Sequence, residues 1–272
     1  MFSFDPARHL YTVDGEPYIH TTSALSILDK SGLIYWASGM ACGEFGWLNP
    51  KKNNSAKCQE AARKGLDKVR GMSLGEYMGH LNKAYRAHDT RKNEAKETGL
   101  DLHALLEEFI SCRMDGHDPL LIDPSIKDFV DWADKNVKKF LFTELCCFTR
   151  ILHIAGTADF GYEDMFGNLV LGDFKSSEAA YYNMYLQCGA YDLQLSENGG
   201  WTEDGQKIFT LPKPFDRYEI FCYRAGLGKP FVTRECNRLK RAFSYCANLY
   251  REKIWWENAI DKKESGIKVF RK

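Results

Sequence analysis

Several features that assign a chain to the membrane-spanning or secreted classes are missing from this sequence. No apolar run approaches the roughly 18 residues of a membrane span, and Met1 opens directly onto a turn-rich strand region. The nine cysteines are odd in number and include no CxxC pair, which argues against zinc-ribbon spacing and against a secreted disulfide framework. We therefore expect an intracellular, soluble protein with free, mostly buried thiols and no membrane association.

A net charge is also missing, because Lys+Arg and Asp+Glu both number 37. Overall charge thus gives no argument for a nucleic-acid partner, and any basic surface must be local. What is present is typical of a folded chain: 272 residues, 44% hydrophobic and 14% aromatic. This is enough for one large core, or for one core with an appended helical region.

The first part of the chain is expected to be a short β-ribbon followed by helices. Residues 2–19 form the ribbon, because two apolar segments flank Asp14-Gly15, the strongest short hairpin signal. Helical segments are expected over 21–28, 33–47 and, with a division near 71–75, over 55–112. This last region is rich in basic residues: Lys57, Arg63, Lys64, Lys68, Arg70, Lys83, Arg86, Arg91, Lys92 and Lys96. A charge-rich helical face is either simply solvated or a contact surface for phosphates, and both interpretations stay open.

The run from Gly99 to Phe109 carries a clear helical pattern. Its leucines and Phe109 repeat at the spacing of one apolar face, while His103 and Glu107, four apart, share a neighbouring edge. Taken alone, His103 is better interpreted as a hydrogen-bonded helix histidine than as a metal ligand.

The stretch from Ile154 to Ser177 is predicted to be a β-hairpin with its turn at Phe166-Gly167-Asn168. Its second arm, 169–172, is apolar on both faces, as in a strand buried on both sides. Asp173 and Lys175 follow and, being two apart, project from one face. Unpaired buried charge is unfavourable, so this arrangement needs a reason. The register is undecided, and a slip of one residue exchanges the faces.

The remaining elements follow from periodicity and capping residues. We expect a helix from Ser125 to about Phe140, a strand over 142–148, a helix over 178–195 capped by Ser176 or Ser177, outer strands over 207–211 and 217–224, and a long final helix opened by Thr233. The strand over 142–148 contains Glu144, a further candidate for the site formed by the hairpin.

The residue types point to one kind of chemistry. Carboxylates converging with an imidazole suit a hard cation such as Mg²⁺ or Mn²⁺. Phosphodiester cleavage uses such an ion to neutralise phosphoryl charge and to lower the pKa of an attacking water. A lysine beside it orients or deprotonates that water, or stabilises the extra charge of the transition state. Asp159, Asp173 and Lys175 supply this inventory. The alternative is a surface hairpin with an ordinary ion pair, which the apolar second arm disfavours.

Four motifs in order resemble the RecB-type branch of the PD-(D/E)xK nuclease superfamily. They are Gly99-x-x-x-His103-x-x-x-Glu107, Gly156-Thr157-x-Asp159, Asp173-x-Lys175 and Gln187-x-x-x-Tyr191. The N-terminal YTVDGEPYIHTTSALSIL, with the following LIYWA, is similar to what many phage-encoded members show ahead of that core. Although D-x-K alone is uninformative, four elements in order on the expected helix, hairpin and helix are much more specific.

The resemblance implies a role for each matching residue. The implied metal ligands are His103, Asp159, Asp173 and the backbone carbonyl of Phe174. Lys175 corresponds to the catalytic lysine, acting with Asp173 and Asp159. Gln187 and Tyr191 are implied to line the site and to position the lysine or the DNA strand, and Glu107 has either a supporting, DNA-side role or a structural one.

The resemblance further implies an α/β (α+β) fold: a restriction-endonuclease-like core with a mixed sheet flanked by helices. Residues 99–272 form this nuclease core with a C-terminal helix, and residues 1–98 form a β-ribbon and helical region that arches over the site. The implied function is a Mg²⁺- or Mn²⁺-dependent DNA exonuclease acting at ends or in single strands, in phage or bacterial recombination, repair or replication. Two rivals stay open: a structure-selective or nicking endonuclease, and a non-catalytic DNA-binding module.

Some family features are absent. Cys222, Cys236 and Cys246 are too widely spaced for the compact cysteine triplet of relatives with an iron–sulfur cluster, so no cluster is expected. The GxxxxGK[ST] motif is missing, so no nucleotide cofactor is expected and any ATP-driven unwinding requires a partner helicase. A recombinase or a single-strand-binding protein is another implied partner, in the cytoplasm of a bacterial or infected host cell.

Overall fold

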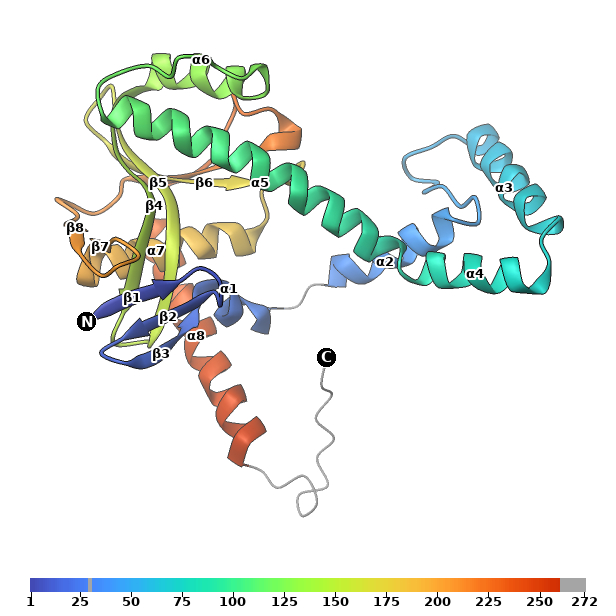
Figure 1. Cartoon of the computed structure of the whole chain (residues 1–272), viewed down its shortest axis with the longest axis horizontal. Helices are drawn as coiled ribbons and strands as arrows, with labels where there is room; N and C mark the ends of the chain where they lie inside the picture. The colour runs from blue at the N-terminus through green and yellow to red at the C-terminus, as the bar shows by residue number, and fades with distance from the viewer. Residues whose placement is uncertain (29–30, 260–272) are drawn as a thin grey trace. The chain divides into compact units, whose positions relative to one another are not determined.

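The chain forms a mixed α/β structure built on a curled, mixed β-sheet (Figure 1). The computed structural model describes residues 1–28 and 31–259, with no description of the side chains at 31–33, 91–101 and 259. The strands are β1 (Phe2–Asp5), β2 (Leu10–Val13), β3 (Glu16–His20), β4 (Val137–Thr149), β5 (Ile154–Asp164), β6 (Leu169–Lys175), β7 (Gly200–Trp201), β8 (Lys207–Phe209), β9 (Arg217–Cys222) and β10 (Phe231–Thr233).

Helices account for most of the remaining described residues. They are α1 (Thr21–Ala24), α2 (Ser31–Gly43), α3 (Ser55–Arg70), α4 (Leu74–Tyr85), α5 (Ala87–Met114), α6 (Lys127–Asn136), α7 (Tyr182–Asn198) and α8 (Cys236–Ala259), with 3₁₀ turns at Leu25–Ile27, Pro124–Ile126 and Tyr223–Ala225. Among the helices described, none has both the length and the apolar character that crossing a bilayer requires.

The chain divides into two compact units. We call residues 1–28 with 101–272 the sheet unit, and residues 29–100 the helical unit. The division expected at residue 98 placed the N-terminal ribbon with the helices, whereas the structure groups residues 1–28 with the sheet. The reason is strand pairing, because Ile19 and His20 of β3 pair in parallel with the start of β5. The predicted ribbon itself is confirmed, and Asp14 and Gly15 at its turn both have positive φ.

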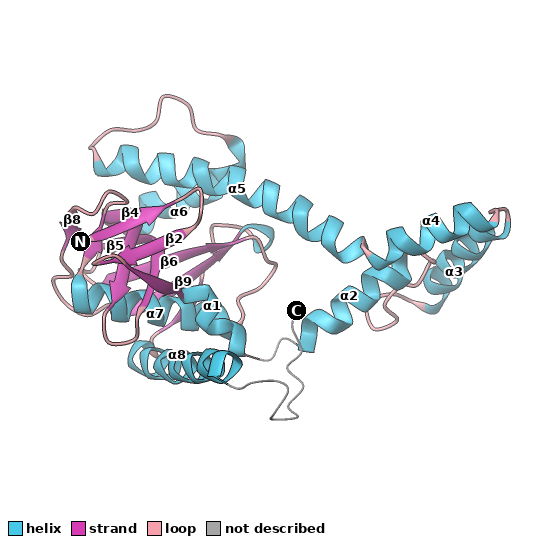
Figure 2. Cartoon of the chain, turned by 60° about the horizontal axis from the view of Figure 1, so that its bottom comes forward, coloured by secondary structure: helices cyan, strands magenta, loops and turns pink. Residues whose placement is uncertain are grey.

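Strand β5 lies at the centre of the sheet unit. It pairs antiparallel with β4 on one side and with β6 on the other, and β6 pairs in parallel with β9. Helices α7 and α8 pack on one face through Leu186 and Leu239, whereas α5 and α6 pack on the other through Phe109 and Phe129. Figure 2 shows the strands in magenta between these helices. The predicted mixed sheet flanked by helices is confirmed at this level.

The predicted hairpin is formed by β5 and β6, and its register is fixed by packing. Phe160 pairs with Gly172, and a Cβ added at Gly172 would lie only 2.1 Å from the Phe160 ring. Only glycine fits beneath this ring. A register shifted by one residue would place a residue with a side chain there. At the turn, Asp164 accepts hydrogen bonds from the backbone N–H groups of Phe166 and Asn168, both at 2.9 Å.

Several element predictions need correction. Thr233 does not open the final helix, because it ends strand β10, and α8 begins at Cys236. The helix expected to reach Phe140 ends at Asn136, because the chain from Val137 pairs with β5 through two register shifts. Neither Ser176 nor Ser177 caps α7, which begins at Tyr182. Strand β9 is not an outer strand, since it lies between β6 and β10. Its alternating pattern was misleading because Glu219 is buried, with its charge paired to Arg217.

The helical unit has a small internal contact region of its own. A Cβ added at Gly65 of α3 would lie 2.1 Å from the carbonyl oxygen of Phe45, so α3 approaches this loop through its backbone. His80 of α4 lies 3.1 Å from the carbonyl oxygen of Glu44, and its ring packs against Phe45. Glycine and histidine thus hold the loop between α2 and α3 against the helices.

Candidate active site

Three carboxylates lie side by side on three adjacent strands. Phe160 of β5 pairs with Gly172 of β6, so the preceding Asp159 lies opposite the following Asp173. On the other edge of β5, Phe160 pairs with Thr143 and Ala158 pairs with Leu145, so Glu144 of β4 also lies opposite Asp159. Since neighbouring strands are about 4.8 Å apart, this register places Glu144, Asp159 and Asp173 in one row across the sheet.

Helix α5 brings an imidazole to this row. His103, Glu144 and Asp159 each offer a ligand atom, and the three atoms lie within 4.8 Å of one another. His103 Nε2 is 2.6 Å from Glu144 Oε1, and its ring stands edge-on to Phe174 at a centroid distance of 5.6 Å. One imidazole and two carboxylates at this separation are a donor set that suits a divalent cation.

The backbone of Glu144 is held in an uncommon conformation. Its φ is +43°, in the left-handed region, although it is neither glycine nor asparagine and lies within a long strand. Such a residue costs on the order of 1–3 kcal/mol and persists only where the surrounding structure fixes it. Here the flanking Thr143 and Leu145 are both paired to β5, so the sheet holds the glutamate beside His103 and Asp159.

Asp159 is buried and fixed by the opposite strand. Its Oδ2 accepts a hydrogen bond from the backbone N–H of Phe174 at 2.7 Å. Burial raises the pKa of Asp159, and the nearby Lys175 ammonium opposes that shift. The hydrogen bond places the Asp159 side chain beside the backbone of Phe174.

Asp173 and Lys175 form an ion pair at the end of β6. The Asp173 side chain is fully buried and that of Lys175 is 21% exposed. Lys175 Nζ also donates a hydrogen bond to the Phe174 carbonyl oxygen at 3.1 Å. Among the described residues, neither Asp173 oxygen receives a hydrogen bond of acceptable geometry. The Lys175 ammonium compensates the charge at Oδ2, whereas Oδ1 has no partner among the described residues, which suits contact with a further cation.

The protonation of this pair follows from burial and mutual attraction. Burial raises the pKa of Asp173 to about 7, with the Lys175 ammonium holding it down and Asp159 adding to the rise. Burial lowers the pKa of Lys175, but the charges of Asp173 and Asp159 outweigh burial and raise it. Lys175 thus stays an ammonium at neutral pH.

The two residues predicted on the following helix are adjacent to the carboxylates. Gln187 Nε2 of α7 donates a hydrogen bond to the Tyr191 hydroxyl at 2.7 Å. Tyr191 is buried, and burial together with the charges of Asp159 and Asp173 raises its pKa well above the ordinary value. Gly156 leaves room for the Tyr191 ring, because a Cβ at this position would lie only 2.8 Å from it.

Glu107 differs from the other predicted residues. It lies one helical turn after His103 and is half-buried, but in the described part of the chain it makes no hydrogen bond or ion pair. It does not belong to the group of ligand atoms formed by His103, Glu144 and Asp159. Asp173 is also outside this group of three, but it lies opposite Asp159 and pairs with Lys175, whereas Glu107 has no such link among the described residues.

Sequence reasoning missed Tyr223, which follows β9. Its ring stacks on Phe174 at a centroid distance of 6.2 Å, and its hydroxyl is buried without a partner among the described residues. Burial raises its pKa, with further contributions from Asp159, Asp173 and Glu144. No local pattern marks this tyrosine, because only the parallel pairing of β9 with β6 brings it to the site.

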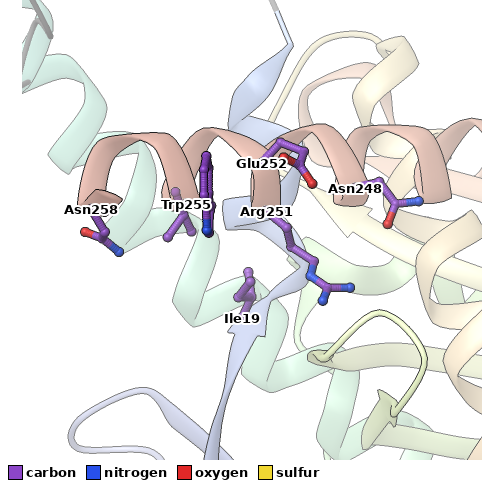
Figure 3. A pocket seen from close by; sticks show the side chains of 7 residues that line it. Ile19, Asn248, Arg251, Glu252, Trp255 and Asn258 are labelled. Atoms are coloured by element: carbon purple, nitrogen blue, oxygen red, sulfur yellow. The ribbon is translucent and has the colours of Figure 1, made fainter. Parts of the chain in front are cut away.

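A separate surface hollow of about 730 Å³ lies along α8. Figure 3 shows Arg251, Glu252 and Trp255 on this helix, with Ile19 of β3 facing them. None of the carboxylate-site residues lines it. Its two opposite charges and single tryptophan define no ligand chemistry, so the carboxylate row is the candidate active site.

The chain has no detectable match among known protein-family models or curated proteins. The function is therefore argued from the geometry of the carboxylate row, together with the ordered motifs that resemble the PD-(D/E)xK nucleases.

Proposed function

We propose that this protein is a Mg²⁺- or Mn²⁺-dependent deoxyribonuclease of the PD-(D/E)xK type, acting as an exonuclease at DNA ends or in single strands. The observation that carries the proposal is the row of Glu144, Asp159 and Asp173 on adjacent strands. An ion pair alone would explain Asp173 and Lys175, but it would not explain two further acids and a histidine beside them.

His103, Asp159, Asp173 and the carbonyl of Phe174 would hold the ion, with Glu144 as an additional oxygen donor. When bound, the ion supplies charge neutralisation at the phosphoryl oxygens and a lowered pKa for the attacking water. The hydrogen bond from the Phe174 N–H orients Asp159, and the register of β5 and β6 keeps both aspartates in place. Preorganisation of this kind needs no rearrangement during the reaction.

Lys175 acts as a hydrogen-bond donor in this proposal. The charges of Asp173 and Asp159 raise the pKa of Lys175, which favours a protonated Nζ that stabilises negative charge on the phosphate or orients the water. At present Lys175 donates a hydrogen bond to the carbonyl oxygen of Phe174 and forms an ion pair with the carboxylate of Asp173. Both hold the ammonium at the end of β6, where a phosphate would meet the row.

The fold supports the same assignment. We interpret β4, β5, β6 and β9 as the core sheet of a restriction-endonuclease-like fold, with α5 and α7 on opposite faces. The parallel strands β6 and β9 are joined across α7, a crossover connection of the kind that parallel pairing requires. The catalytic residues then lie on strands and helices of the core, with little dependence on loops.

The test is digestion of single- and double-stranded DNA, labelled separately at each end, with Mg²⁺, with Mn²⁺ and with chelator. We expect metal-dependent release of label from one end first, which gives polarity and strandedness together. A covalently closed circle distinguishes the endonuclease alternative, because an exonuclease leaves it intact. No cleavage of any DNA with either metal would overturn the proposal.

A further inference from the structure

The helical unit carries the positive charge that the chain as a whole lacks. Residues 29–100 contain thirteen Lys and Arg against eight Asp and Glu, whereas the rest of the chain contains twenty-four against twenty-nine. The net charge of zero is therefore the sum of a basic helical unit and an acidic sheet unit. Such asymmetry is a physical argument for a polyanionic partner of the basic part.

Helix α4 in this unit exposes apolar side chains in a continuous stripe. Leu74, Met78, Leu81 and Tyr85 recur at helical spacing, and the first and last are 78% and 77% exposed. Among the side chains described in this unit, only Gly65, His80 and Ala84 are buried. The stripe is therefore not the core-facing side of α4, and an exposed apolar face of this kind marks an interaction surface.

A surface hollow adjoins the end of this stripe. It has a volume of about 500 Å³ and is lined by Asn82, Lys83, Tyr85 and Arg86. Lys83 Nζ lies 3.2 Å from Glu44, which Lys68 also approaches at 3.9 Å, so this one acid is shared by two lysines. The hollow thus combines cations, an amide and an exposed aromatic ring.

We propose that this face of α4 binds a single nucleic-acid strand, with a base on the ring of Tyr85 and adjacent phosphates on Lys83 and Arg86. Single strands expose both phosphates and base faces, and aromatic side chains beside basic ones are the usual means of holding them. A duplex hides its base faces, and a second copy of this chain would bring a like-charged surface. The inference goes beyond the proposed cleavage, because binding here requires no metal.

The experiment measures binding of the full chain, in chelator, to a fluorescent oligothymidylate of about 20 nucleotides and to an abasic strand of equal length. Lys83→Gln with Arg86→Gln is expected to weaken both by about tenfold and to reduce the salt slope by about 1.4, since each phosphate contact in single strands contributes about 0.7. Tyr85→Ala is expected to weaken only the oligothymidylate, by about tenfold. Tyr85→Phe keeps the ring and should bind like the wild type.

The matched control combines Lys127→Gln and Tyr245→Ala, which remove a lysine 66% exposed and a tyrosine 72% exposed from the sheet unit. It should leave binding to both strands unchanged. Unchanged binding by the α4 variants, or equal weakening of both strands by Tyr85→Ala, would overturn the proposal. So would sedimentation showing a wild-type dimer that Tyr85→Ala dissociates, since the face would then join two copies.

The two proposals fail separately. Strand-selective binding without any cleavage would reject the nuclease and leave the α4 surface standing. Metal-dependent cleavage, with binding unaltered in the α4 variants, would support the nuclease and reject the α4 surface.

Discussion

The sheet unit and the helical unit contrast in both packing and charge. The sheet unit buries long runs of β5 and β6 and carries a surplus of acidic residues, four of them in or near the candidate site. The helical unit buries few of its described side chains and carries a surplus of basic ones. In the two proposals above, the rigid sheet would hold carboxylates together for a cation, whereas the open helical surface would bind a flexible polyanion.

The largest effect is expected from breaking the ion pair at the end of β6. Asp173→Ala and Lys175→Ala should each lower metal-dependent cleavage by about 10³-fold, because the first would remove a metal ligand and the second the ammonium that would stabilise charge on the reacting phosphate. Single-turnover digestion of end-labelled DNA measures this. Binding of single strands in chelator should be retained, since it belongs to the helical unit. Full activity in both variants would show that the site lies elsewhere.

The next effect distinguishes two glutamates of similar exposure. Glu144→Gln is expected to lower cleavage and Mn²⁺ affinity by about 10–100-fold, because Glu144 lies in the carboxylate row and contacts His103. Glu107→Gln should change both by less than about twofold, since this residue is outside the group of ligand atoms. Calorimetric titration with Mn²⁺ measures the affinity. Equal effects would contradict the assignment of Glu144.

The packing contrast can be tested with one substitution in each unit. In the sheet unit, Gly156→Ala should destabilise the fold by about 1–3 kcal/mol, because the new Cβ would lie 2.7 Å from Thr21 Oγ1 and 2.8 Å from the Tyr191 ring. In the helical unit, Gly79→Ala should stabilise by about 0.5–1 kcal/mol, since nothing lies within 4 Å and alanine favours the helix. Urea unfolding measures the free energy of unfolding of both variants. Changes of the same sign would contradict the difference in packing between the two units.

The last prediction concerns the pH dependence of metal binding. Burial lowers the pKa of His103, but the hydrogen bond with Glu144 and the charge of Asp159 outweigh it and raise the pKa to about 9. Because a metal binds the neutral imidazole, Mn²⁺ affinity should rise by up to about tenfold per pH unit as pH increases towards 9.

Without metal, the stability that this ion pair contributes has the opposite sign. It is fully present below the ordinary pKa of 6.5 and is lost as pH rises through about 9. His103→Gln should flatten both dependences. Calorimetric titration and thermal melts across this range measure them, and an unchanged slope in the variant would assign the proton to another group.

Much of the local structure could be predicted from sequence because short-range rules dominate it. Asp14-Gly15 and Phe166-Gly167-Asn168 specify tight turns, and the break between α3 and α4 follows from Gly71 to Gly75. Prediction failed where tertiary contacts override such signals. The start of β4 is a strand because it pairs with β5, although its sequence continues a helical pattern. Glu219 is buried within β9 because Arg217 and Tyr162 satisfy its charge.

For the candidate site, the sequence by itself determined the inventory: the acids and lysine of the hairpin, the histidine four residues before Glu107, and the glutamine–tyrosine pair. Only the tertiary structure decided which of them meet. The register of β4, β5 and β6 aligns Glu144 with both aspartates, and the parallel pairing of β9 brings Tyr223 to Phe174. These are contacts between residues far apart in the chain, and a strand pattern of period two leaves the choice of neighbour and register open until the side chains pack.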